Sequence, residues 1–133
     1  MKILKAQKSL PNFTLQYFDV KSLRTIPPDN WLTRRSNEFG YYESFKKHGM
    51  IWPIAVTDHT QQWVKDRILP KNPQHKDKDG NLISGLYVHI GNKRVLWAKH
   101  NGYDQIEGYF FSTMEDKRKI YQLQHIEHTE IPK

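Results

Sequence analysis

The chain has 133 residues, a formal net charge of +7 and a sequence pI near 9.6, with 37% apolar and 13% aromatic residues. Its length predicts a single domain, and its aromatic content excludes a disordered chain. The absence of cysteine excludes disulfides, thiolate nucleophiles and cysteine metal sites, and no stretch approaches the roughly 18 apolar residues of a membrane span. We therefore expect a soluble cytoplasmic protein with anionic partners and no membrane association.

Short elements separated by strong structure breakers are predicted for the first half of the chain. Residues 1–12 carry three lysines and are expected to form a loose basic arm. Residues 13–20 are rich in strand formers, and the prolines at 27 and 28 predict a break before a connector over 31–35. The elements expected next are a helix from Tyr41 to His48 closed by Gly49, a buried strand over 52–57, and a brief helix over 61–68 capped by Asp58 or Thr60.

The second half is more regular. Residues 70–81 are expected to form an exposed loop with a tight turn at Asp79 and Gly80. The elements expected after it are a strand over 86–90, a helix over 93–101 closed by Gly102, a strand over 104–111 and a helix capped by Thr113. This alternation predicts an α+β fold, a small mixed β-sheet with flanking helices. The domain is expected to span 13–133, with an exposed insert at about 58–85.

Gly91-Asn92-Lys93-Arg94 is the segment with the most informative chemistry, because it joins the apolar run 86–90 to a helical pattern. A helix that starts after a glycine presents backbone N–H groups and a partial positive charge to a ligand. Lysine and arginine add full charges there, the arginine as a two-pronged donor. The turn therefore predicts a phosphate site. The alternative interpretation is a basic helix start on a solvated surface.

The order of the motifs extends this prediction. A helix ending in KKHGMIWPIAV (46–56) leads, after an insert, to LYVHIGNKRVLWA (86–98) and then to a further strand. This order resembles the N-terminal domain of the ParB/sulfiredoxin superfamily, in which a G-x-x-x-P-I-x-V strand precedes a strand ending in G-x-x-R. The resemblance covers about residues 14–131. It implies a stand-alone ParB-like accessory domain, encoded by a phage or plasmid and acting in the host cytoplasm, without a helix-turn-helix module.

A nucleotide pocket is what the resemblance implies for function. Its ligand would be a nucleoside di- or triphosphate with a magnesium ion (Mg2+), or the phosphates of a nucleic acid, and no haem, flavin or iron–sulfur cluster is expected. The implied phosphate-binding residues are Gly91, Asn92, Lys93 and Arg94, with Arg94 the principal candidate and with Arg34 and Arg35 as additional ones. The residues implied for the wall beside base and sugar are Gly49, Met50 and Pro53.

Two departures from the family pattern bear on catalysis. Sulfiredoxins carry a cysteine in the G-x-x-R turn, so the absence of cysteine here excludes sulfinic-acid reduction. ParB proteins and related kinases usually carry a glutamate after the glycine, where this chain has Asn92, and an amide cannot act as a general base. The resemblance therefore implies binding, with catalysis in doubt.

Two other functions stay open at this point. One is a protein-interaction factor whose basic surface and insert dock on an acidic host or virion protein. The other is a metal-dependent nuclease or small-molecule kinase. Its catalytic candidates would be Glu127, His128 and Glu43, of which Glu127 and His128 are also the metal candidates.

Three further patterns favour structural interpretations. His125 and His128 could share a metal with nearby glutamates, although a polar helix face explains them as well. Residues 77–81 resemble part of a calcium loop but lack its terminal ligands, so they predict a turn. Residues 63–67 and 94–97 interleave basic and aromatic side chains that could stack on bases. Trp97 is expected in the core, whereas Trp63 is a candidate for binding a ligand or a partner protein.

Overall fold

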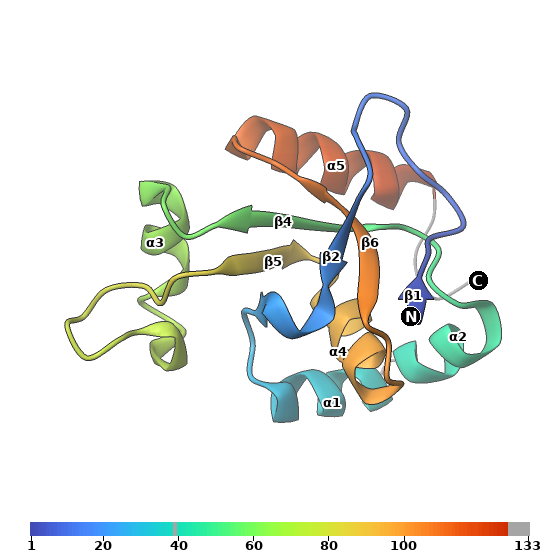
Figure 1. Ribbon diagram of the computed structural model, residues 1–133, viewed down its shortest axis with the longest axis horizontal. Coiled ribbons are helices and arrows are strands. Elements are labelled where there is room, and N and C mark those ends of the chain that lie inside the picture. Colours follow the sequence, from blue (N-terminus) through green and yellow to red (C-terminus); the bar gives the residue numbers. More distant parts are fainter. Residues whose placement is uncertain (39, 128–133) are drawn as a thin grey trace.

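The computed structural model describes residues 1–38 and 40–127, in which helices pack on both faces of a mixed β-sheet (Figure 1). The strands are β1 (Ile3–Leu4), β2 (Gln16–Asp19), β3 (Leu23–Thr25), β4 (Ile54–Asp58), β5 (Leu86–Ile90) and β6 (Gln105–Phe110). The helices are α1 (Asp29–Glu38), α2 (Tyr41–His48), α3 (Gln62–Ile68), α4 (Asn92–His100) and α5 (Met114–Glu127), with 3-10 turns at Val20–Ser22 and Pro73–His75. The predicted α+β fold class is confirmed.

The sheet runs in the order β1-β6-β4-β5-β3, with β2 also paired to β6. The pairs β1–β6, β4–β6 and β3–β5 are parallel, whereas β2–β6 and β4–β5 are antiparallel. Strand β4 therefore occupies the middle of the sheet. Four of its five residues are buried, because both of its faces are covered by helices.

Alternating residues of β4 divide the core into two layers. Ile54 and Val56 belong to the cluster that contains Val95 of α4, whereas Ala55 belongs to the cluster that contains Ile120 of α5. Because successive strand residues point to opposite faces, α4 and α5 cover opposite faces of the sheet. In the described part of the chain, no helix combines the length and apolar character needed to cross a membrane.

A β-bulge lies at the end of β5. Ala55 and Val56 are adjacent in β4, yet their partners Ile90 and Val88 are two residues apart, so His89 is the extra residue. A bulge turns the strand locally and redirects its side chains. Here it brings Ile90 into the α5 layer of the core, immediately before the turn at Gly91.

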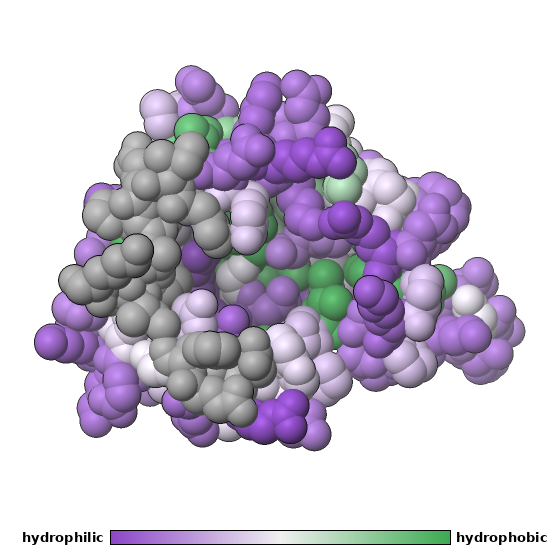
Figure 2. Space-filling view, turned by 180° about the vertical axis from the view of Figure 1, so that it is seen from behind, coloured by the Kyte–Doolittle hydropathy of each residue, from purple (hydrophilic) through white to green (hydrophobic). Residues whose placement is uncertain are grey.

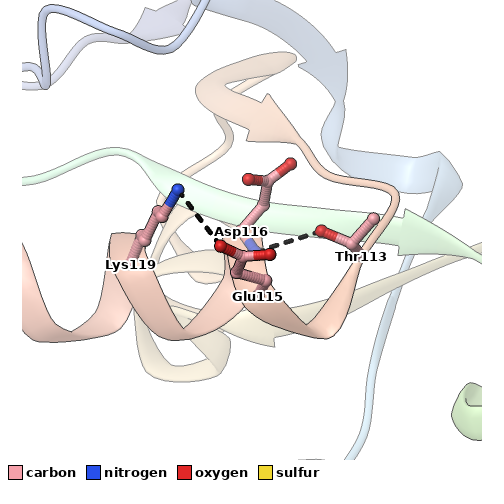
Figure 3. A network of polar contacts seen from close by, with 4 residues as sticks. All are labelled: Thr113, Glu115, Asp116 and Lys119. Atoms are coloured by element: carbon pink, nitrogen blue, oxygen red, sulfur yellow. Dashed lines mark hydrogen bonds and ion pairs between the residues drawn. The ribbon is translucent and has the colours of Figure 1, made fainter.

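Several predicted elements are confirmed. Helix α2 ends at Gly49, whose φ of 71° is the left-handed conformation that favours glycine. The strand over 86–90 is found with those bounds. Thr113 caps α5, since its Oγ1 accepts a hydrogen bond of 3.1 Å from the backbone N–H of Asp116 (Figure 3).

Two predictions for the first half of the chain are wrong. Residues 31–35 are part of α1 rather than a connector, because Leu32, which is 1% exposed, packs this helix into the fold beside α4. Residues 1–12 are not a loose arm: β1 pairs with β6, and Leu4 and Leu10 are buried. Burial of these apolar side chains outweighs the basic character of the segment.

Most residues of the loop over 70–81 are exposed, as predicted, and His75 is its buried residue. His75 is 4% exposed, donates from Nε2 to the carbonyl of Ile26 at 2.8 Å and accepts from Nη2 of Arg24 at 3.2 Å. The turn at Gly80 is confirmed, and Asp77 accepts hydrogen bonds from two backbone N–H groups within it. Neither Asp58 nor Thr60 is the N-cap of α3, which is Gln61. Asp58 instead accepts two hydrogen bonds from Thr60, which lower its pKa.

Candidate anion site at the start of helix α4

A cavity of about 410 Å³ opens where β5 leads into α4. This volume lies within the range of about 300–1,000 Å³ that is usual for small-molecule sites. Figure 2 shows apolar side chains in the hollow of this face, surrounded by polar ones. The described lining residues are Pro27, Trp31, Leu32, Tyr41, Phe45, His89, Ile90, Gly91, Asn92, Lys93, Arg94, Tyr121 and Gln124.

Gly91 is required by the backbone at this turn. Its φ of 96° and ψ of 30° are left-handed, and a Cβ added to it would lie 2.7 Å from Cγ2 of Ile54. As the N-cap residue it has no side chain with which to bond the first turn of α4. The positive end of a nine-residue helix therefore meets the cavity without a side-chain cap at its N-cap position.

Asn92 joins three parts of the fold. Its Oδ1 accepts a hydrogen bond of 2.9 Å from the backbone N–H of Ile26, and its Nδ2 donates one of 3.0 Å to the carbonyl of Val88. A carboxylate in this place could accept the first bond but could not donate the second. The donor and acceptor character of the amide thus explains an asparagine at this position.

Arg94 is held inside the protein. Its side chain is 8% exposed, and Nη1 donates to the carbonyl of Pro53 at 3.0 Å and reaches Oε1 of Gln124 at 3.5 Å. Nε2 of Gln124 donates to the same carbonyl at 3.2 Å. The guanidinium therefore ties α4 to α5 and to the segment before β4, while its charge adds to the positive potential of the cavity wall.

Lys93 and several aromatic side chains complete the lining of the cavity. Nζ of Lys93 lies 4.2 Å from the centroid of the Tyr41 ring, a cation–π contact. Trp31 and Tyr121 also line the cavity and are 39% and 49% exposed. Within the described lining there is no carboxylate, so the site combines a helix N-terminus, two cations and aromatic faces. This set of groups suits an anion that carries a flat ring.

The other predicted site residues lie outside the described lining of the cavity. Gly49 ends α2, and Met50, 1% exposed, packs in the core that contains Val95. Pro53 is buried and contributes its carbonyl to Arg94. Glu43 and Arg34 are exposed on α2 and α1.

Some candidates cannot be placed in the site. The side chains of Arg35, His125 and Glu127, and the whole of His128, lie outside the described residues. Among the described residues no group of three or more His, Asp or Glu side chains could hold a metal ion.

Sequence reasoning did not identify the aromatic walls. Trp31, Tyr41 and Tyr121 come from α1, α2 and α5 and reach one cavity only through the packing of these helices. Their sequence signal is weak, because the local pattern predicts only a short helix for Tyr41 and a connector for Trp31. The turn at residues 91–94 could be identified from the sequence, because its glycine and its two cations lie within four consecutive residues.

Comparison with known proteins gives one kind of match. No family model matches the sequence, and no curated protein matches it. Among solved structures, the chain is similar to one described as "Structure of the C2221 form of Pnob8-like ParB-N domain", with 16% sequence identity and a TM-score of 0.39. The match covers 84% of this chain and 35% of that chain, so this chain spans about a third of the length of the protein it resembles.

Proposed function

We propose that this chain is a binding domain for a nucleoside phosphate, free or within a nucleic acid, whose phosphate is held at the Gly91–Arg94 turn. One observation carries the proposal: the N-terminus of α4, with no side-chain cap from Gly91, meets a cavity of about 410 Å³ that also contains Lys93. Backbone N–H groups at a helix start, joined by a cation, are a general means of binding phosphate.

The aromatic side of the cavity supports a nucleoside rather than phosphate alone. Trp31 and Tyr121 present ring surface at the cavity, and a base can stack on such surfaces. Since no carboxylate is among the described lining residues, a magnesium ion would be carried by the ligand's own phosphates. The protein itself would then supply no ligand to the magnesium ion from the described lining.

Binding is favoured over turnover by the position of Asn92. Both polar atoms of its side chain are engaged with backbone groups of Ile26 and Val88, so this residue supports the turn and supplies no general base. Glu43, a catalytic candidate from the sequence, is exposed on α2 outside the described lining.

A calorimetric titration tests the proposal with two matched variants of α4. Lys93→Gln removes the cation at the cavity, whereas Lys99→Gln removes an exposed cation at the other end of the same helix. We expect Lys93→Gln to weaken the affinity for a nucleoside triphosphate by roughly tenfold or more, the usual effect of a lost charge-assisted contact. Lys99→Gln is expected to stay within about twofold of the parent.

Parallel titrations with the nucleoside and with inorganic phosphate separate the base from the phosphate contribution. We expect both fragments to bind more weakly than the triphosphate. Equal effects of the two lysine variants, or no binding of any nucleotide by the parent chain, would refute the proposal. If a stable acidic protein were then retained by the chain, the protein-interaction alternative would take its place.

A further inference from the structure

Three cations at the junction of α3 and α5 have no partner in the described structure. Arg67 and Arg118 are exposed, and Lys117 is half-buried. Among the side chains that the structure describes, none of the three makes an ion pair or a hydrogen bond. Lys119, one turn from Glu115, does pair with that carboxylate at 3.5 Å. The junction thus keeps its cations unpaired although a neighbour on the same helix is paired.

An aromatic group sets the geometry of this junction. The ring centroids of Trp63 and Phe111 are 6.0 Å apart with their planes at 30°, and the ring centroid of His89 lies 5.6 Å from that of Trp63 and 5.5 Å from that of Phe111. Because Trp63 and Arg67 are four residues apart, they share one face of α3. The ring contacts of Trp63 therefore place this face of α3 beside the end of β5 and the segment that leads into α5. Figure 1 shows α3 and the start of α5 at the same end of the molecule.

The cations of the junction disfavour one another's charged forms, and they also act on His89. Burial lowers the pKa of Lys117, and the charges of Arg67 and Arg118 lower it further. Burial also lowers the pKa of His89 to about 3, with added effects from Lys117 and Arg67. Nε2 of His89 is buried and has no hydrogen-bond partner among the described residues. An anion here would relieve the repulsion among the cations.

We propose that Arg67, Lys117 and Arg118 form a second anion site, which binds a phosphodiester group of a nucleic-acid strand. Guanidinium groups match phosphate oxygens, and exposed cations along adjoining helices suit a polyanion that passes over the surface. His89 lines the α4 cavity and also contacts Trp63, so the two regions adjoin. The second site does not depend on whether the cavity binds a nucleotide.

Fluorescence anisotropy with a labelled single-stranded oligothymidylate tests this site. The matched variants are Lys117→Gln and Lys119→Gln, which remove the same charge from the same helix two residues apart. We expect Lys117→Gln to weaken binding roughly tenfold and to reduce the slope of log affinity against log salt by about 0.7, the value for one phosphate of a single strand. Lys119→Gln is expected to weaken binding by less than about threefold.

Thermal melting of both variants provides the folding control. Lys117→Gln is expected to melt no lower than the parent, because it removes an unpaired, half-buried charge. Equal weakening by the two variants, absence of oligothymidylate binding at low salt, or stronger competition by polyglutamate than by unlabelled oligothymidylate would overturn the proposal. Retained triphosphate binding in Lys117→Gln would separate this site from the cavity, so the two proposals can fail independently.

Discussion

Two regions of this protein contain the same dipeptide in opposite situations. Lys93-Arg94 at the start of α4 has partners within the protein: Arg94 is buried against the carbonyl of Pro53, and Lys93 lies over Tyr41. Lys117-Arg118 in α5 has no partner in the described structure. The comparison shows that the sequence Lys-Arg does not by itself indicate whether the two cations have partners within the fold. The surroundings decide whether a cation of such a pair supports the fold, as Arg94 does, or lies exposed on the surface, as Arg118 does.

The largest effect is expected from Gly91→Ala, which tests how firmly the α4 turn belongs to the fold. A Cβ at this position meets Ile54 at 2.7 Å and also requires a positive φ. Strain and overpacking each cost about 1–3 kcal/mol, so we expect the free energy of unfolding to fall by about 3 kcal/mol. Urea denaturation measures it.

Gly102→Ala is the control for that variant. Gly102 also has a positive φ, of 71°, but a Cβ there meets nothing within 4 Å. It should therefore show the backbone cost alone, about 1 kcal/mol. Equal losses in the two variants would show that packing at Gly91 contributes nothing.

Arg94→Met is expected to have the next largest effect on stability. The substitution keeps much of the apolar stem and removes the donor to Pro53. Because a hydrogen bond from a charged group contributes about 1.5–3 kcal/mol, we expect a loss of about 2 kcal/mol, measured by urea denaturation. Unchanged stability would contradict the structural role assigned to Arg94.

His89→Phe is expected to change the pH dependence of stability. The pKa of His89 is lowered to about 3 in the folded protein, so between that value and about 6.5 the unfolded chain binds more protons than the folded one. The free energy of unfolding therefore falls as the pH is lowered through this window, by up to about 1.4 kcal/mol per pH unit. The phenylalanine variant should lose that part of the slope, measured by denaturation between pH 4 and 7. Parallel pH profiles in parent and variant would contradict it.

Lys117→Met is expected to have the smallest effect and completes the comparison. This side chain is half-buried and unpaired, so its replacement by an apolar chain of similar length should change the free energy of unfolding by no more than about 0.5 kcal/mol, or increase it slightly. Chemical denaturation beside Arg94→Met measures the contrast. A loss as large as that of Arg94→Met would show that Lys117 also supports the fold.

Elements with a local signal could be predicted. Helix α2 has apolar and aromatic residues at helical spacing and ends at Gly49, and β5 is an apolar run of strand formers. Helix α1 could not be predicted, because Leu32 is its one fully buried apolar residue and leaves no helical pattern of apolar positions. The helix depends instead on packing beside α4. The two-residue strand β1 could not be predicted from its own residues, because its stability comes from pairing with β6.

The candidate site divides in the same way. The strand, the left-handed Gly91 and the helix start are consecutive, so backbone preferences within a few residues were enough to predict them. The aromatic walls could not be predicted, because Trp31 and Tyr121 are 90 positions apart in the chain.

The sequence by itself determined the fold class and the start of α4 at a left-handed glycine, since both depend on local periodicity and on the conformational freedom of Gly91. Only the tertiary structure decided which cations are paired. The acceptor for Arg94 is the carbonyl of Pro53, and the groups around Lys117 come from α3 and β5 as well as α5. Hydrogen bonds and burial of this kind depend on distances in space, which separation along the chain does not specify.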